Sequence, residues 1–366
     1  MRLLKFAILP VLLGSLLAGC QQAPSQSQAP VAETVKPQAT ADAPKDPEVE
    51  KMIETANALF KPLPEYMGKE VAGSEMIDLG RMLYYEKRLS KDGSISCNSC
   101  HNLQTYGVDG EPTSLGVGGQ RGGRNSPTVY NAALHIAQFW DGRSPHVEDQ
   151  ASGPMLNPVE MAMDTTQVEE RLKAIPGYRK LFASAFPDSE NPVTIDNAAK
   201  AIAAFERGLV TPGAFDKFLA GDAGALTHDQ LDGYKLFVDV GCASCHNGAA
   251  LGGGQYQKLG VKKPYETADL GRYEVTHKEQ DKMKFKVPGL RNIAETGPYF
   301  HDGSVKTLPE GISLMAEHQL GKTLTNEEVV KIEAFLKSLT GEIDQKYVAE
   351  PELPPGEVSL QQRGES

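Results

Sequence analysis

Apolar side chains recur at intervals of three and four residues in several parts of the chain, which places them on one face of an α-helix. Between these parts lie stretches rich in Gly, Pro and polar residues, and no strand pattern competes with the helical one. The pattern therefore predicts a mainly α protein. The apolar positions of the expected helices are Met76, Leu79 and Leu83; Val168, Leu172 and Ile175; Ile195, Ala199, Ile202, Phe205 and Leu209; Leu231, Tyr234 and Val238; and Val329, Ile332, Phe335, Leu336 and Leu339.

Polar residues mark where three of these helices begin. Ser74 is the expected cap of the first, and Thr227 with Gln230 and Thr325 with Glu328 have the spacing of a capping box. Gly341 is the expected stop of the last helix.

Cys97-Asn98-Ser99-Cys100-His101 has the Cys-x-x-Cys-His pattern of covalent haem attachment, and it recurs as Cys242-Ala243-Ser244-Cys245-His246. The two thiols bond the vinyl groups of one haem, and the histidine binds its iron. A zinc site or a disulfide is the competing interpretation, but the gap between the two pairs is too long for a compact zinc site. Four of the five cysteines lie in these motifs, so we predict two covalently bound haem c groups.

An internal repeat surrounds the two motifs. Gly80-Arg81-Met82-Leu83-Tyr84 precedes the first, and Gly233-Tyr234-Lys235-Leu236-Phe237 precedes the second. Downstream, we align 124–127 with 291–294, and Phe139-Trp140-Asp141-Gly142 with Phe300-His301-Asp302-Gly303. The repeat indicates an all-α chain with two cytochrome c-like haem domains in tandem.

The N-terminus has the features of a bacterial export signal. Arg2 and Lys5 precede a short apolar run that ends in Leu17-Ala18-Gly19-Cys20. This ending resembles the lipobox, in which the cysteine carries the lipid; an ordinary signal peptide is the alternative. The residue after the cysteine is Gln21 rather than Asp, and this resembles the rule by which lipoproteins are sorted to the outer membrane. We therefore expect a periplasmic protein held at the outer membrane only through a lipid on Cys20.

These features divide the chain into five parts. They are a signal peptide (1–19), a flexible tether (20–48), an N-terminal cytochrome c-like domain (49–212), a C-terminal cytochrome c-like domain (213–341) and a tail (342–366) that packs on the N-terminal domain or is disordered. The formal net charge is −11 and there is no basic patch, so we expect no nucleic-acid partner.

From about residue 50 to 350 the sequence resembles the bacterial dihaem cytochrome c peroxidases. Five motifs carry the resemblance: Cys-Asn-Ser-Cys-His-Asn at 97–102, Asn-Ser-Pro-Thr-Val at 125–129, Gln-Phe-Trp-Asp-Gly-Arg at 138–143, Pro-Val-Glu-Met at 158–161 and Pro-Tyr-Phe-His at 298–301. The resemblance implies reduction of hydrogen peroxide to water with electrons from a small donor protein, a cytochrome c or a cupredoxin. It also raises the expectation of a homodimer.

The resemblance assigns catalytic roles to three residues. Glu160 is the acid-base residue beside the first haem and Gln150 is its companion, because peroxide cleavage needs a group that moves a proton between the two oxygens. Trp140, the only tryptophan, is the electron bridge between the haems. The alternative for Trp140 is a packed aromatic at a domain interface.

The resemblance also assigns metal ligands. His101 and His246 bind the two irons, and Met315 completes the second, which suits electron storage because a His/Met pair raises the potential. Met283 is the competing candidate. Asn125, Thr296 and Pro298 match the family's calcium site.

One position departs from the family. Many members have a histidine in the loop after the first motif that caps the first iron, and Val117 stands there. Valine does not bind iron, so either the first haem is open or another residue, such as His135 or His146, caps it. We favour the open haem.

Two other functions are compatible with two haems. A non-catalytic dihaem electron carrier would have both irons six-coordinate and negligible peroxide turnover. An enzyme that oxidises an organic or protein substrate through the same chemistry would be found by substrate screening.

Overall fold

The computed structural model describes residues 46–358 and residue 360. The predicted signal peptide, Cys20, the tether up to residue 45, and tail residues 359 and 361–366 lie outside the described residues. The helices are α1 (Pro47–Leu59), α2 (Ser74–Tyr85), α3 (Cys97–Cys100), α4 (Val147–Leu156), α5 (Thr165–Ala174), α6 (Pro176–Ala185), α7 (Ile195–Glu206), α8 (Ala214–Leu219), α9 (His228–Val240), α10 (Tyr273–Thr276), α11 (Leu308–Met315) and α12 (Asn326–Lys337).

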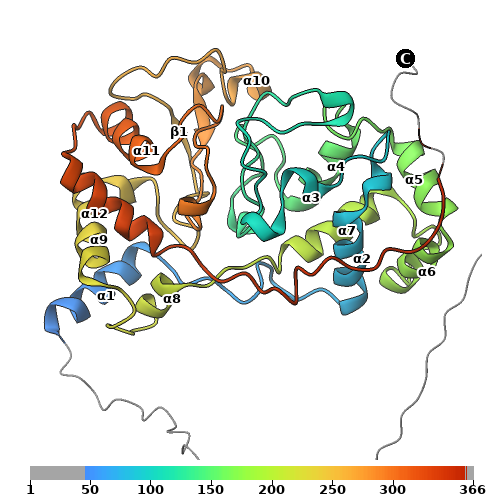
Figure 1. Cartoon of the computed structure of the whole chain (residues 1–366), viewed down its shortest axis with the longest axis horizontal. Coiled ribbons are helices and arrows are strands. Elements are labelled where there is room, and N and C mark those ends of the chain that lie inside the picture. Colours follow the sequence, from blue (N-terminus) through green and yellow to red (C-terminus); the bar gives the residue numbers. More distant parts are fainter. Residues whose placement is uncertain (1–45, 359, 361–366) are drawn as a thin grey trace, which may run out of the picture. The chain divides into compact units, whose positions relative to one another are not determined.

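The described chain is mainly helical, as predicted (Figure 1). Its strands are β1 (Tyr256–Lys258) and β2 (Lys284–Lys286), which form one antiparallel pair. The hydropathy pattern does not predict them, because three residues are too few to show alternation. Within residues 46–358, no helix combines the length and the apolar character needed to cross a membrane.

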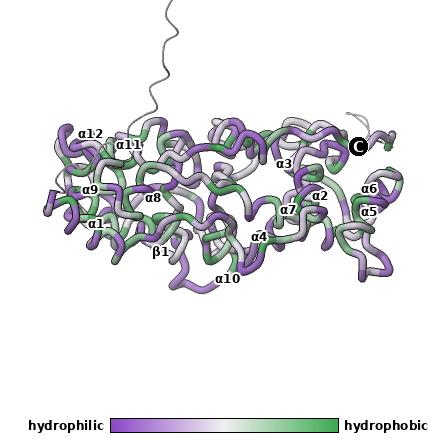
Figure 2. Tube along the Cα trace, turned by 90° about the horizontal axis from the view of Figure 1, so that it is seen from below, coloured by the Kyte–Doolittle hydropathy of each residue, from purple (hydrophilic) through white to green (hydrophobic). Residues whose placement is uncertain are grey.

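Two separate hydrophobic cores organise the fold. The first core gathers side chains of α2 and α4–α7, and the second gathers those of α1, α8, α9, α11 and α12. Figure 2 shows hydrophobic and hydrophilic positions alternating along helices such as α2 and α9, as expected of helices with one buried face. The apolar positions predicted for the helices all lie in, or pack against, these cores.

The two ends of the described chain pack in opposite cores. The N-terminal helix α1 joins the second core, and the C-terminal tail joins the first. Phe60, just after α1, lies edge-on to Phe215 of the second core, with ring centroids 5.5 Å apart. In the tail, Val348 is buried in the first core, and its carbonyl oxygen accepts a hydrogen bond of 2.6 Å from Tyr85 Oη. Tyr347 stacks on Phe205 at 5.1 Å. Packing on the N-terminal domain is one of the two expectations for the tail, whereas the sequence pattern gives no sign that α1 joins the second core.

The capping predictions are confirmed at two helices and wrong at one. Thr227 and Gln230 form a capping box at α9, and Thr325 and Glu328 form one at α12. Ser74 does not cap α2: Gly73 occupies the N-cap, and the Ser74 hydroxyl bonds to the Glu75 carboxylate instead. α12 already ends at Lys337.

The internal repeat appears as two close helix crossings. A Cβ on Gly80 of α2 would lie 1.8 Å from the Ala201 carbonyl oxygen on α7. A Cβ on Gly233 of α9 would lie 1.9 Å from the Lys331 carbonyl oxygen on α12. Each haem domain therefore has one pair of helices whose backbones touch where the repeat places a glycine.

The structure corrects the register of part of the repeat. The counterpart of Asn292 is Asn131, because both have a left-handed backbone and each precedes a short turn, 132–134 or 293–295. The alignment of 124–127 with 291–294 is therefore wrong. The later alignment is supported, since Phe139 and Phe300 share positive φ angles of 66° and 69°. Trp140 and His301 thus occupy equivalent positions.

We predict that Gly80→Ala destabilises the protein by about 1–3 kcal/mol, because the added methyl group forces α2 away from α7. The measurement is thermal unfolding of the haem-containing protein. Gly224→Ala is the control, because a Cβ there meets only ordinary contact, 3.5 Å from Asp222 Oδ1. If the two variants were equally stable, the close approach of α2 and α7 at Gly80 would not be needed for stability.

Candidate haem sites

The first attachment motif forms one helical turn. α3 brings Cys97 and Cys100 to the same side of the chain, since residues three apart are neighbours on a helix. The Ser96 N–H donates to Ser99 Oγ at 2.9 Å and fixes the start of the turn. The carbonyl oxygen of His101 accepts a hydrogen bond of 2.7 Å from Tyr84 Oη of α2. The motif is therefore anchored to the first core.

Both motif histidines are oriented in the same way. His101 Nδ1 lies 3.3 Å from the Gly107 carbonyl oxygen, and His246 Nδ1 lies 3.3 Å from that of Leu251. A carbonyl oxygen only accepts, so Nδ1 carries the proton in each ring and Nε2 keeps its lone pair for a metal. Burial lowers the pKa of His101, and it lowers the pKa of His246 to about 4, which keeps both rings neutral.

The four motif cysteines form no disulfide in the described chain. Burial raises the pKa of Cys100 to about 11 and that of Cys242 to about 11. Among the described residues, no group of three or more His, Cys, Asp or Glu is placed to hold a metal ion. The donors therefore fit thioether attachment of haem better than a zinc site.

A cavity of about 270 Å³ lies beside the second motif. Its lining is largely apolar and includes Cys242, Cys245, His246 and Met315. An apolar cavity with a neutral imidazole, a thioether sulfur and two thiols is chemically suited to a haem c. The residues present thus fit the group that the motif predicts.

Met315 is held at the end of α11 by the turn that follows it. Residues 316–320 form a π-helical turn, a feature often found at functional sites. His318 Nδ1 donates to the Lys263 carbonyl oxygen at 2.9 Å, and Gln319 Oε1 accepts from the Gly260 N–H at 2.6 Å. Met283 lies elsewhere, in a second surface pocket with Lys258 and Tyr265.

Glu160 lies half-buried in the loop after α4. Its Oε1 accepts a hydrogen bond of 2.7 Å from Asn157 Nδ2. Burial raises the pKa of Glu160, against the opposing effects of the Asn157 hydrogen bond and of Arg143. Its charge also contributes to the raised pKa of Cys97 and Cys100, so it lies near the first motif. Gln150 is half-buried on α4.

The loop that contains Val117 packs directly on this glutamate. The Val117 N–H donates to the Glu160 carbonyl oxygen at 2.7 Å, and Gly116 leaves no room for a Cβ beside Val159. His135 makes its contacts with the second domain, where its ring packs on Gly253 and Gly289. His146 is an exposed residue at the start of α4.

Trp140 and the three predicted calcium ligands line the far part of the cavity described above. The indole Nε1 donates to the Asn125 carbonyl oxygen at 2.9 Å. The Trp140 ring lies edge-on to His301, with centroids 6.4 Å apart. Asn125, Thr296 and Pro298 all line this cavity.

Sequence reasoning missed a buried pair beside this tryptophan. Lys286 Nζ donates to His135 Nδ1 at 2.9 Å, and the Lys286 N–H donates to the Trp140 carbonyl oxygen at 2.8 Å. Burial lowers the pKa of Lys286 to about 8. No local pattern joins residues so far apart in sequence, so only the fold reveals the pair.

Comparisons with known proteins agree with these sites. Residues 74–224 match the family described as di-haem cytochrome c peroxidase, and residues 230–340 match the cytochrome c family. The chain is 50% identical to the cytochrome c551 peroxidase of Nitrosomonas europaea over 77% of this chain and 84% of that protein. It is 45% identical to the cytochrome c551 peroxidase of Pseudomonas aeruginosa over 84% and 91% of the two chains.

A solved structure is also similar. The crystal structure of a MauG-like protein associated with microbial copper homeostasis matches with a TM-score of 0.69 and 28% identity, over 79% of this chain and 98% of that one. Two haem-attachment motifs, two cores and relatives this similar lead to one conclusion: the chain belongs to the di-haem cytochrome c peroxidase family.

Proposed function

We propose that this protein reduces hydrogen peroxide to water with electrons that it receives one at a time from a small donor protein, a cytochrome c or a cupredoxin. The observation that carries the proposal is the difference between the two haem sites. A half-buried carboxyl group, Glu160, lies close enough to the first motif for its charge to act on Cys97 and Cys100, and a thioether, Met315, lines the cavity beside the second. One site is thus suited to proton transfer and the other to storing an electron.

Cys97, Cys100 and His101 would hold one haem c and Cys242, Cys245 and His246 the other, and these groups would supply the redox chemistry. The protein supplies the proton transfer. Glu160, as the carboxylate, takes a proton from one peroxide oxygen and returns it to the other, which leaves as water. Asn157 holds the carboxyl group through its 2.7 Å hydrogen bond, and Gln150 on α4 is the proposed polar companion.

The interface between the two sites supports electron transfer through Trp140. The indole Nε1 of Trp140 donates to the Asn125 carbonyl oxygen, and the backbone carbonyl oxygen of Trp140 accepts from the Lys286 N–H. Asn125, Thr296 and Pro298 line the same cavity, and we propose that their oxygens bind a calcium ion there.

We also propose that the protein is exported to the periplasm and anchored to the outer membrane through a lipid on Cys20. Covalent haem attachment in bacteria takes place outside the cytoplasm, which agrees with export.

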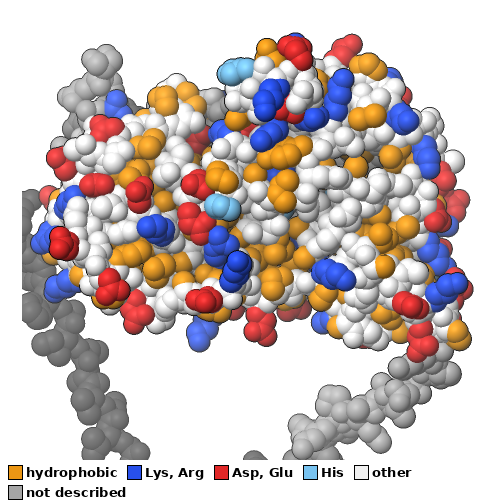
Figure 3. Space-filling view, turned by 180° about the vertical axis from the view of Figure 1, so that it is seen from behind, with side chains coloured by type: hydrophobic (Ala, Val, Ile, Leu, Met, Phe, Trp, Pro, Cys, Tyr) orange, Lys and Arg blue, Asp and Glu red, His pale blue; other side chains and the backbone are white. Residues whose placement is uncertain are grey.

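Acidic and basic side chains are intermingled on the face in Figure 3, with hydrophobic side chains between them. Such a mixed surface suits a soluble donor protein better than a nucleic acid. A homodimer is part of the same proposal.

The decisive experiment mixes the haem-loaded protein with a reduced small cytochrome c and hydrogen peroxide and follows oxidation of the cytochrome. We expect rapid turnover, and we expect Glu160→Gln to lower kcat/KM for peroxide by about 10²- to 10⁴-fold because the proton carrier is lost. Glu170→Gln, an exposed position on α5, is the control. Negligible turnover by the wild type would favour a plain electron carrier.

The same assay has a pH signature. Glu160 must be ionised to accept a proton, and its pKa is raised by burial, so activity falls as the pH drops through that raised value. Glu160→Gln removes this acidic limb. A limb that persists in the variant would assign it to another group.

Val117 leads to a prediction about the first iron at rest. We expect the oxidised protein to show a high-spin signal in electron paramagnetic resonance beside the low-spin signal of the second haem, because valine offers no ligand. Val117→His converts the high-spin signal to low-spin, whereas Leu115→His, an exposed position in the same loop, leaves it unchanged. Two low-spin signals in the wild type would show that the first iron is capped.

Met315 leads to a prediction about the second iron. Met315→Leu removes the thioether, so the second haem loses its low-spin state and its reduction potential falls. Met283→Leu is the matched control, since Met283 lies in the other pocket. Potentiometry and low-temperature spectra measure both effects. If Met283→Leu alone produced them, the ligand assignment would be reversed.

A further inference from the structure

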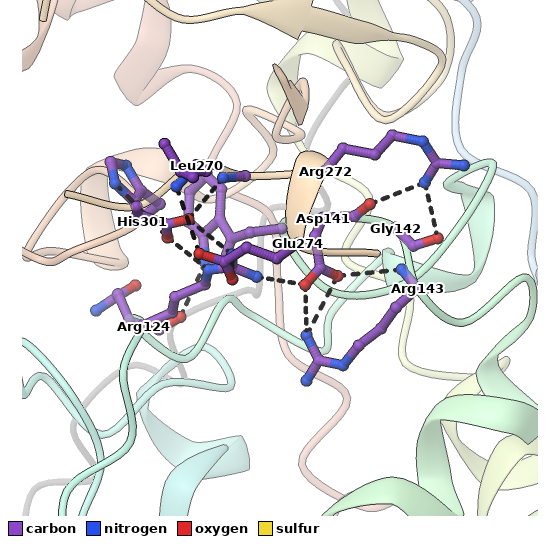
Figure 4. A network of polar contacts seen from close by, with 12 residues as sticks. Arg124, Asp141, Gly142, Arg143, Leu270, Arg272, Glu274 and His301 are labelled. Carbon is purple, nitrogen blue, oxygen red and sulfur yellow. Dashed lines mark hydrogen bonds and ion pairs between the residues drawn. The ribbon is translucent and has the colours of Figure 1, made fainter. Parts of the chain in front are cut away.

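One arginine joins three carboxylates from both haem domains. Arg124 Nε and Nη2 donate to the two oxygens of Asp269 at 2.6 and 2.8 Å, and Nη2 also donates to Glu274 at 3.0 Å. Its remaining nitrogen, Nη1, pairs with Asp141 of the first domain. Figure 4 shows the guanidinium between these acids. The group therefore bridges residues 124–141 and 269–274.

Asp141 is the direct neighbour of Trp140, and Arg124 is the direct neighbour of Asn125. The two segments are therefore joined twice, through the Arg124–Asp141 ion pair and through the hydrogen bond from Trp140 Nε1 to the Asn125 carbonyl oxygen. A displacement of Asp141 displaces the indole with it, because the two residues share one tight turn with positive φ at Phe139 and Gly142.

The second domain holds the same turn from its other side. Arg272 Nη1 donates to the carbonyl oxygens of Asp141 and Gly142 at 2.9 and 3.2 Å. The Asn125 N–H donates to the His301 carbonyl oxygen at 2.7 Å. Arg124 differs from these contacts because it alone among them pairs side-chain charges across the interface.

The ion pairs of Arg124 with Asp141 and Asp269 are shielded from water, whereas Glu274 is half-exposed. The side chains of Arg124, Asp141 and Asp269 are 16%, 5% and 17% exposed. Removing the guanidinium leaves two largely buried carboxylates without their shared cation, which is far more costly than losing a surface ion pair. Lysine does not replace it, because only the planar guanidinium can bind both oxygens of Asp269 and, at the same time, one oxygen of Asp141.

We propose that Arg124 is a positioning residue for electron transfer between the two haems: it clamps the Trp140–Asp141 turn onto Asp269 and Glu274 and so fixes the indole at the domain interface. This inference rests on the proposed role of Trp140 as electron bridge. It predicts that loss of the clamp slows transfer between the haems without altering the peroxide site, which lies at Glu160.

The test uses haem-loaded Arg124→Gln protein. One haem is reduced rapidly with a single electron, and the rate of equilibration between the haems is followed by absorbance. We expect a loss of about tenfold or more, since an ångström-scale misplacement of a reacting group has effects of this order. The rate of the first reaction with peroxide should stay within about twofold of the wild type, as expected for a distant site.

Arg143→Gln is the matched control. Arg143 Nη1 pairs with the same Asp141 carboxylate at 3.0 Å, but its side chain is 41% exposed and makes no ion pair with the second domain in the described chain. We expect an unchanged equilibration rate. An equal slowing in both variants would overturn the proposal, because it would reflect loss of charge beside Asp141 rather than loss of the bridge. Asp269→Asn, which weakens the same clamp from the second domain, replaces Arg124→Gln if that variant does not fold.

A double variant separates this proposal from the role of Trp140. If Arg124 acts through the indole, electrons equilibrate between the haems of the double variant Trp140→Phe/Arg124→Gln no more slowly than in Trp140→Phe alone. If the two losses multiply, Arg124 does not act through Trp140 and the proposal fails. If Trp140→Phe alone keeps the wild-type rate, the proposed electron bridge fails, whatever Arg124→Gln shows.

Discussion

In each haem domain two helix backbones approach each other closely at a glycine, and the position of the attachment motif depends on this approach. Gly80 lets α2 touch α7, and Gly233 lets α9 touch α12. The attachment motifs are fixed relative to these helices: Tyr84 of α2 holds the His101 carbonyl group, and α9 runs directly into Gly241 and the Cys242 turn. A helix pair separated by one further methyl group would shift the proximal histidine with it, which is why the position tolerates no side chain.

The two domains use this common frame for different chemistry. Their proximal sides are alike, with both histidines held by a carbonyl oxygen through Nδ1. Their other sides differ. The loop that contains Val117 packs on Glu160 in the first, and Met315 at the end of α11 lines the cavity of the second. A carboxyl group can move protons and a thioether stabilises reduced iron, so the proposed division of labour between the two haems depends on side chains outside the repeated frame.

The interface between the domains is polar at its edge and aromatic at its centre. Trp140 and His301, equivalent positions of the repeat, meet edge-on, and charged groups around Arg124 surround them. The buried His135–Lys286 pair adds a further polar contact across the same boundary. Because buried charges are costly unless they are paired, this arrangement favours one relative placement of the two domains over others. A fixed placement is what transfer of an electron between two haems requires.

The sequence by itself determined the local features: two attachment motifs, the amphipathic helices, two of three helix caps and the existence of a repeat. Each of these depends on residues within a few positions of one another, where periodicity and spacing suffice. Only the tertiary structure decided that Asn131 rather than Asn125 corresponds to Asn292, that α1 belongs to the second core, and that Arg124 meets Asp269. These contacts join segments far apart in the chain, and a local pattern carries no information about which distant partner a side chain will find.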